Sequence, residues 1–221
     1  MRKPAVDYRN FKLSKINSPE FEHLKFLLGW VGYFALYFIT ENFIPYEKCA
    51  PVHSFLDDLV PFCEFFVVFY VGWYVLIVVT LLYFALYSPD LFKKVMIFII
   101  TTQVLAMCVY IAFPNRQDLR PEVFPRENIF TNLLSLIYSF DTSTNVCPSL
   151  HVAYSVGIAS AWMREETVSK LTKILVTIFC FFVCISVTFV KQHSVLDIFA
   201  AIPVCMMAEY MAFHMNKKKT A

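Results

Sequence analysis

Six long apolar stretches constrain this chain more than any other feature of its sequence. They run approximately over 24–44, 64–87, 92–113, 150–163, 171–190 and 195–215. A helix needs about 20 mainly apolar residues to cross the hydrocarbon core of a bilayer, and the fourth stretch is the short one. Only 16% of the residues are charged, against about a quarter in an ordinary soluble domain. The sequence therefore predicts an all-α integral membrane bundle of six transmembrane helices.

The positions of the basic residues predict how this bundle faces the membrane. If the N-terminus is inside, only five of the 19 Lys and Arg residues fall on the outer side, namely Lys48, Arg116, Arg120, Arg126 and Lys191. Cytoplasmic loops carry an excess of Lys and Arg, so both termini are expected in the cytoplasm. The expected organisation is a polar tail over 1–23, a membrane domain over 24–215 and a basic tail over 216–221. We expect a multi-pass protein of the plasma (cell) membrane.

The polar segments narrow the class of protein further. The first 23 residues lack the apolar core and cleavage site of a signal peptide, and the basic residues form no nucleic-acid footprint. The seven cysteines show no metal-ligand spacing, although a Cys49–Cys63 disulfide is possible on an oxidising face. The first outer loop, 45–61, contains prolines that break helices. The long outer loop, 114–148, contains an apolar run, 129–140, that can lie along the membrane interface.

Three polar clusters are expected on the outer face. The fourth and sixth helices both start there, with His151 at the start of one and His193 at the start of the other. The third helix ends on that face and delivers Arg116 and Arg120. Topology alone therefore places clusters that are far apart in sequence on one side of the membrane.

His193 and Asp197 are expected to act as a pair. Residues four apart share one face of a helix, and a carboxylate on one imidazole nitrogen fixes the tautomer and frees the other nitrogen as a nucleophile or base. Asp197 lies one turn into an apolar helix, where an unpaired carboxylate would be costly. The pairing accounts for both residues.

The surroundings of the two histidines suit a phosphate group. Two helix N-termini present unpaired N–H groups and partial positive charge, and Arg116, Arg120 and Lys191 add full charges. Such an environment binds phosphate. Two histidines beside it suit phosphoryl transfer, in which one attacks phosphorus and the other handles the proton of the leaving oxygen.

Each of these residues and motifs also has a purely structural interpretation. A His in a membrane helix often binds a backbone carbonyl, and His23, His53 and His214 are expected to be only surface or interface residues. A His–x3–Asp spacing can be a structural pair, and Lys191 can be an interfacial anchor. Pro-Ser before a helix is ordinary capping chemistry. The convergence of these groups on one face favours a functional site.

At these residues the sequence resembles the type 2 phosphatidic acid phosphatase (PAP2) superfamily, which includes vanadium haloperoxidases. The family has three blocks, Lys-x6-Arg-Pro, Pro-Ser-Gly-His and Ser-Arg-x5-His-x3-Asp. Arg120-Pro121 resembles the end of the first block, and Pro148-Ser-Leu-His151 resembles the second. Ser186, His193 and Asp197 match the third at the right spacing. The six-helix layout is also the family's, so the resemblance covers about 24–215.

Three positions depart from the family pattern. Phe113 stands where the first block has lysine, Leu150 where the second has glycine, and Val187 where the third has arginine. Arg116 or Lys191 can replace the missing lysine charge. The Pro-Ser-Leu-His variant is more similar to the branch that contains inositol phosphorylceramide synthases, which transfer phosphate-bearing head groups between lipids.

The resemblance implies a role for each site residue. His193 would be the nucleophile and form a phosphohistidine, with Asp197 orienting it. His151 would protonate the leaving alcohol and then deprotonate water or an acceptor hydroxyl. Four residues would hold the phosphate oxygens: Ser149, Arg120, Arg116 and Lys191. Neither a metal ion nor a cofactor is required, because positioned positive groups stabilise the phosphoryl charge.

The leading hypothesis is thus a membrane phosphatase that hydrolyses a lipid phosphate monoester or diphosphate at the extracytoplasmic face. Its expected partners are that lipid phosphate and the bilayer, with no nucleic acid. One alternative is a lipid head-group phosphotransferase. A second is a non-catalytic anion-binding membrane protein or transporter.

Overall fold

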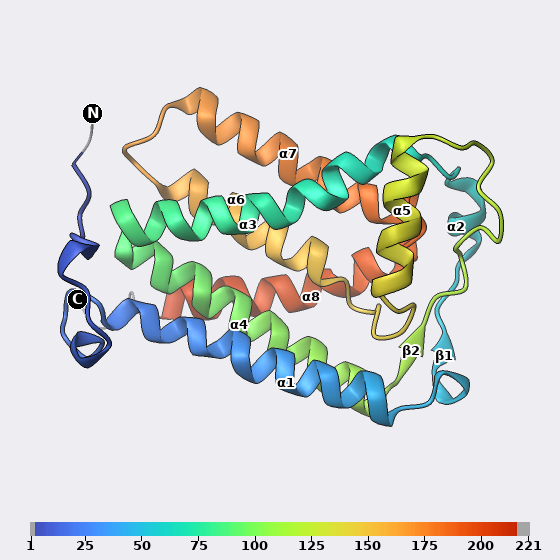
Figure 1. Cartoon of the computed structure of the whole chain (residues 1–221), viewed down its shortest axis with the longest axis horizontal. Coiled ribbons are helices and arrows are strands. Elements are labelled where there is room, and N and C mark those ends of the chain that lie inside the picture. The colour runs from blue at the N-terminus through green and yellow to red at the C-terminus, as the bar shows by residue number, and fades with distance from the viewer. Residues whose placement is uncertain (1–2, 216–221) are drawn as a thin grey trace.

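The computed structural model of the chain describes residues 3–215 and is mainly helical (Figure 1). Six helices form the bundle: α1 Leu28–Phe43, α3 Val67–Tyr87, α4 Pro89–Ala112, α6 Leu150–Arg164, α7 Lys170–Phe189 and α8 Val195–Glu209. Two shorter helices, α2 Phe55–Leu59 and α5 Ile129–Phe140, belong to the connections. The strands β1 Ala50–Pro51 and β2 Asn115–Arg116 pair in parallel. The all-α prediction is confirmed.

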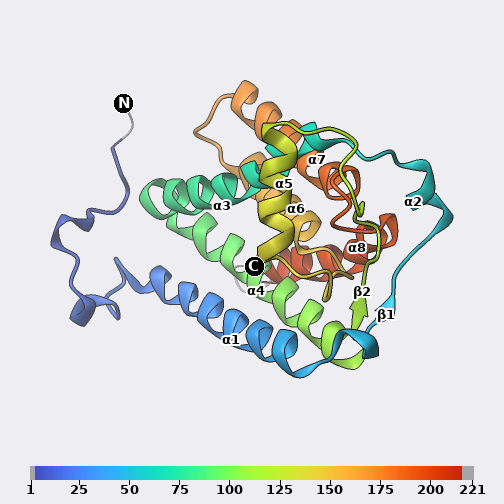
Figure 2. The ribbon, with the colours of Figure 1, turned by 45° about the vertical axis from the view of Figure 1, so that its right-hand side comes forward.

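The bundle helices run in alternating directions along one common axis (Figure 1). The connections 44–66, 113–149 and 190–194 consequently gather at one end of the bundle, which we call the site end. The start of α1 and the end of α8 lie at the other end (Figures 1 and 2). The end of α4 and the starts of α6 and α8 therefore meet, as the order of the apolar stretches predicts.

Five helical segments within residues 3–215 are long and apolar enough to cross a bilayer: Glu22–Phe43, Glu64–Tyr87, Pro89–Ala112, Lys170–Phe189 and Val195–His214. The fourth predicted span is not among them. At 15 residues and about 1.5 Å per residue, α6 falls short of the roughly 30 Å hydrocarbon core. It packs against α3, α4, α7 and α8 instead, and most of its side chains are buried. By length alone, five of the six predicted spans are shown.

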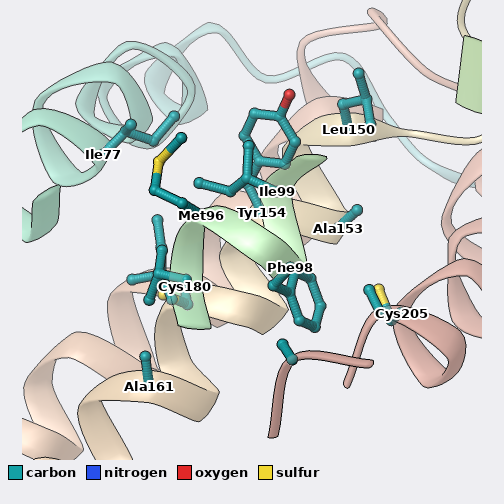
Figure 3. Packing of buried hydrophobic residues seen from close by; sticks show 14 of the residues in the cluster. Ile77, Met96, Phe98, Ile99, Leu150, Ala153, Tyr154, Ala161, Cys180 and Cys205 are labelled. Atoms are coloured by element: carbon teal, nitrogen blue, oxygen red, sulfur yellow. The ribbon is translucent and has the colours of Figure 1, made fainter. Parts of the chain in front are cut away.

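The central position of α6 depends on small residues (Figure 3). Ala153 and Ala161 are buried in the cluster that also contains Phe98 of α4. A Cβ atom added to Gly157 would lie 2.4 Å from Cδ1 of Phe98, so α4 and α6 approach as closely as they do only because this position lacks a side chain. Small residues commonly allow close helix packing inside membranes, where no hydrophobic effect drives helices together.

The first residues fold back onto the turn between α3 and α4. The Tyr8 hydroxyl lies 2.6 Å from Nε2 of His23 and donates to the carbonyl oxygen of Ala85 at 3.0 Å. The prediction of a surface or interface position for His23 is wrong, because its side chain packs edge-on against Phe92 and only 1% of the residue is exposed. Such long-range contacts leave no periodic signal in a sequence.

The site end contains more regular structure than the sequence predicts. The first connection forms α2 despite its prolines, because five helical residues fit between Pro51 and Pro61 and Ser54 begins the helix with a capping box. The second long connection contains α5, which lies across the end of the bundle (Figures 1 and 2). Asn128 caps α5 by accepting from the N–H groups of residues 130 and 131. Cys49 and Cys63 are free thiols.

Candidate active site

His193, which lies just before the N-cap of α8, and Asp197, in the first turn of that helix, form a buried pair. The Nδ1 atom of His193 lies 3.0 Å from Oδ2 of Asp197, and that oxygen also accepts from the Ser194 N–H at 3.0 Å. His193 is 8% exposed and Asp197 is fully buried. Within residues 3–215, Nε2 of His193 makes no hydrogen bond. The carboxylate therefore selects the tautomer with the proton on Nδ1, and the lone pair on Nε2 is available for chemistry.

His151, in the first turn of α6, lies against two aromatic rings of α3. Its ring centroid is 4.4 Å from that of Tyr70 and 4.1 Å from that of Trp73. The His193 ring is 5.7 Å away, inclined by 66°. The Nε2 atom of His151 is buried and has no hydrogen-bond partner within residues 3–215. An imidazole of α6 and one from the α7–α8 turn thus meet in one buried place.

Backbone contacts fix the start of α6 against the start of α8. The Ser149 N–H donates to the carbonyl oxygen of Asp197 at 3.2 Å. Upstream, the buried Asn115 side chain accepts from the N–H groups of Val146 and Cys147 at 2.9 and 2.8 Å. Burial, followed by the nearby Asp197, raises the pKa of Cys147 to about 12, so this thiol stays neutral beside the carboxylate. These contacts set the distance between the histidines.

A cavity of about 340 Å³, which we call the aromatic cavity, leads from the two histidines into the bundle. Its polar end contains His151, His193, Asp141 and Gln192, and its walls come mainly from α1 and α3. The wall residues of these two helices are Trp30, Tyr33, Phe34, Tyr37, Trp73, Tyr74, Ile77 and Val78. Phe34, Tyr74 and Val78 are more than half exposed. The cavity therefore opens on the apolar side of the bundle, between α1 and α3.

A second cavity of about 340 Å³, the polar cavity, lies next to the first. Both cavities are lined by Asp141, Thr142 and Thr144. The polar cavity also contains Glu41 and Arg120. Burial raises the pKa of Asp141 above its ordinary value, and the Tyr70 hydroxyl, which donates to it at 3.0 Å, opposes that rise. A carboxyl group thus stands where the two cavities meet.

Arg120 contacts Gln192, the residue that precedes His193 in the chain. Its Nε donates to Oε1 of Gln192 at 3.0 Å, and its NH1 and NH2 groups donate to the carbonyl oxygens of Tyr138, Asp141 and Thr142. Its guanidinium also lies 4.6 Å from the centre of the Tyr138 ring. The side chain ties the connection after α5 to the residue that precedes His193.

The other two basic residues are engaged elsewhere at the site end, and neither lines the aromatic cavity. Arg116 donates to the carbonyl oxygen of Cys49 at 2.6 Å and to Asp118 at 3.1 Å. Lys191 donates to the carbonyl oxygens of Asp57 and Val60 at 3.0 and 2.6 Å. Burial lowers the pKa of Lys191. The phosphate-binding roles of Arg116 and Lys191 stay predictions, and in this structure both residues hold loops together.

The two helix N-termini differ in what occupies them. Ser149 is buried, and its hydroxyl caps α6 by accepting from the Val152 N–H at 3.4 Å. The N–H groups of Leu150 and His151 have no acceptor within residues 3–215. At α8, a carboxylate of the chain itself, that of Asp57, accepts from the Val195 N–H at 2.7 Å. Only the start of α6 retains free donors for an added anion.

Several residues of this site escape sequence reasoning. Tyr70 and Trp73 sit within an apolar run that resembles any other membrane helix, and Asp57, Asp141 and Gln192 lie in connections. The only available signal is their residue type, since carboxylates beside apolar helices need partners. Within residues 3–215, no three His, Cys, Asp or Glu side chains gather as a potential metal-ligand set.

Comparison with known protein families, with curated proteins and with solved structures finds no match for this chain. The geometry of the site is therefore the basis for a functional assignment.

Proposed function

We propose that this chain is an integral membrane enzyme that cleaves a lipid phosphate monoester or diphosphate through a phosphohistidine on His193. One observation carries the proposal. Two buried histidines, one of them oriented by a buried carboxylate, lie at the polar end of a cavity that opens on the apolar side of the bundle. A lipid fits such a cavity with its phosphate at the histidines and its chain between α1 and α3.

The geometry supports a two-step reaction. Nε2 of His193 attacks phosphorus, and the bond between phosphorus and the leaving oxygen breaks as His151 donates a proton to that oxygen. In the second step, His151 takes a proton from water, whose oxygen attacks the phosphohistidine and releases phosphate and the free imidazole. For the first step His151 starts as an imidazolium with a proton on Nε2 and becomes neutral imidazole when that proton goes to the leaving oxygen. Burial without a partner leaves Nε2 open to the substrate oxygen.

The free N–H groups at the start of α6 supply the first electrostatic support for the phosphate. Those of Leu150 and His151 donate to no acceptor within residues 3–215, and the partial positive charge of the helix start adds to them. Arg120 adds a full positive charge beside the aromatic cavity, because its Nε donates to Gln192, which lines it. Negative charge that develops on the transferring group is stabilised by donors that are already oriented.

The resemblance to the PAP2 superfamily supports the same chemistry, because its histidines and aspartate correspond to His151, His193 and Asp197. We extend the proposal to orientation. With α6 as a sixth, bundle-enclosed crossing, both termini are cytoplasmic and the site end is extracytoplasmic at the plasma membrane. The low number of Lys and Arg residues at the site end favours this orientation.

The decisive experiment uses the full chain in lipid nanodiscs. A panel of lipid monophosphates and diphosphates without added metal should yield free phosphate, and His193→Ala should abolish its release. His53→Ala is the matched control, since His53 is exposed and pairs only with the neighbouring Asp58. Acid-labile label trapped on His193 excludes a purely anion-binding protein. Wild-type turnover by His193→Ala would refute the proposal.

Head-group transfer to an alcohol is a second candidate. The observation that favours it is the polar cavity, which adjoins the aromatic cavity at Asp141, Thr142 and Thr144 and provides a separate space for a hydrophilic acceptor. In that case the acceptor hydroxyl replaces water in the second step. A labelled donor lipid incubated with polyols and with lipid alcohols separates the two outcomes. Formation of free phosphate alone would rule out transfer to the acceptors used.

A further inference from the structure

We propose that Asp57, in α2 of the first connection, is a positioning residue that holds the nucleophile His193 in place through Ser194. This inference rests on the proposed function for its catalytic consequence. The contact itself joins residues that are far apart in the chain and belong to different connections at the site end. Nothing in the sequence around Asp57 points to His193.

The contacts of Asp57 converge on the residues that follow His193. Its Oδ2 accepts from the Ser194 hydroxyl at 2.6 Å, and its Oδ1 accepts from the Val195 N–H at 2.7 Å. The Ser54 N–H donates to the same Oδ2 at 2.8 Å as part of the α2 capping box. Asp57 is 2% exposed. Both carboxylate oxygens are thus used, and two of the three donors belong to the start of α8.

Lys191, on the other side of His193 in the chain, joins the same two segments. Its ammonium group donates to the backbone carbonyl of Asp57 at 3.0 Å and to that of Val60 at 2.6 Å. The backbone of Lys191 adopts a left-handed conformation with φ of 53°, which turns the chain sharply between α7 and α8. A third contact, the Cys63 N–H to the Phe189 carbonyl at 3.0 Å, completes the attachment. The first connection is therefore hydrogen-bonded to the α7–α8 turn on both sides of His193.

Ser194 links the first connection to the proposed nucleophile, His193. Its hydroxyl donates to Asp57, while its N–H donates to the same Asp197 oxygen that contacts Nδ1 of His193. Asp57 touches neither the imidazole nor the aromatic cavity, so it does not act on reacting atoms. A small displacement of a reacting group costs a large factor in rate, and loss of the Asp57 contacts frees the residue next to His193.

Asp57→Asn is the informative substitution. An asparagine has one acceptor oxygen where the carboxylate has two, and its NH2 group would face an N–H or O–H donor. Asp58→Asn is the matched control, because Asp58 is the adjacent residue but is exposed and bonds only to His53. In nanodiscs with lipid phosphate, Asp57→Asn should lower kcat by about tenfold or more with KM unchanged. Asp58→Asn should match the wild type.

A second readout separates this inference from the proposed function. In protein with 15N-labelled histidine, the proton on Nδ1 of His193 should give a downfield NMR resonance that is assigned by its loss in His193→Ala. Asp57→Asn should shift or broaden this signal, and Asp58→Asn should preserve it. If the wild type turns over no lipid phosphate, the proposed function fails, and the resonance still decides the positioning role.

Ser194→Ala provides the test if Asp57→Asn does not fold. It leaves the Ser54 and Val195 contacts of Asp57 in place, so the first connection stays attached. It should reproduce the loss of kcat and the altered resonance, and Ser194→Thr, which restores a hydroxyl, should recover both. A folded Asp57→Asn or Ser194→Ala protein that keeps the resonance and turns over lipid phosphate as fast as Asp58→Asn would overturn the proposal.

Discussion

The imidazole rings of His151 and His193 lie 5.7 Å apart, although His151 is in the first turn of α6 and His193 is in the turn that precedes α8. Their separation is set by backbone contacts, because the Ser149 N–H donates to the Asp197 carbonyl and joins the first turns of α6 and α8. Each ring then has its own support. Asp197 fixes the His193 ring, and Tyr70 and Trp73 hold the His151 ring. This asymmetry fits the division into nucleophile and proton donor that we propose.

Asp197→Asn should lower kcat about a hundredfold or more while the protein stays folded. The amide can present its NH2 group to Nδ1, which favours the tautomer with the proton on Nε2 and removes the nucleophilic lone pair. Turnover of a lipid phosphate and formation of phosphohistidine measure the effect. Asp90→Asn, at an exposed position in the first turn of α4, serves as the control. Equal amounts of phosphohistidine in the two variants would contradict the orienting role.

Arg120→Lys should destabilise the site end and reduce turnover, although the charge is kept. A lysine has one nitrogen and cannot reach Gln192 and the three backbone carbonyl oxygens that the guanidinium binds together. We expect a loss of about 1–3 kcal/mol in the free energy of unfolding, because several hydrogen bonds of a half-buried network are lost together. Thermal unfolding in nanodiscs measures it. Arg9→Lys, at a side chain that is 88% exposed, should show no comparable loss.

Asp141 should make stability depend on pH in a defined direction. Its pKa is raised in the folded protein, mainly by burial, so folding favours the protonated form. Its contribution to stability is complete below the ordinary pKa of aspartate, about 4, and is lost as the pH rises through the higher folded value. Asp141→Asn cannot ionise and should lack this decline.

Unfolding midpoints of wild type and Asp141→Asn, measured from acid to neutral pH, test the prediction about Asp141. The variant should gain stability relative to the wild type as the pH rises. Tyr70→Phe removes a donor that lowers the pKa of Asp141 and should move the decline to higher pH. A parallel pH dependence in wild type and Asp141→Asn would contradict the prediction.

Gly157→Ala should destabilise the bundle, whereas Gly32→Ala should not. A Cβ atom at position 157 would lie 2.4 Å from Cδ1 of Phe98, and forcing an added methyl group into a packed interior costs about 1–3 kcal/mol. At position 32 a Cβ atom meets nothing within 4 Å, so alanine's higher helix propensity can add up to about 1 kcal/mol. Thermal unfolding of both variants makes the comparison. An equal effect would show that α4 and α6 can separate without cost.

Much of the fold could be predicted because apolar length and order are properties of the chain itself. Alternation of direction follows from consecutive crossings, and it brings the end of α4 to the starts of α6 and α8. Two features differ from the prediction. α6 is too short to span by length and is enclosed by its neighbours, and His23 is buried by a fold-back of the first residues onto the α3–α4 turn. Neither feature leaves a periodic pattern in the sequence.

The order of the apolar stretches already indicates which residues can meet at the site end. The four-residue spacing of His193 and Asp197 correctly predicts their contact, although His193 lies before the N-cap of α8 and not on a helix face. What each charged group does at the site end depends on how the loops fold. Arg116 and Lys191 satisfy backbone carbonyls, and Asp57 occupies the helix start where an external anion was expected. A buried charge must find a partner, and which partner is nearest depends on loop paths that no local sequence pattern encodes.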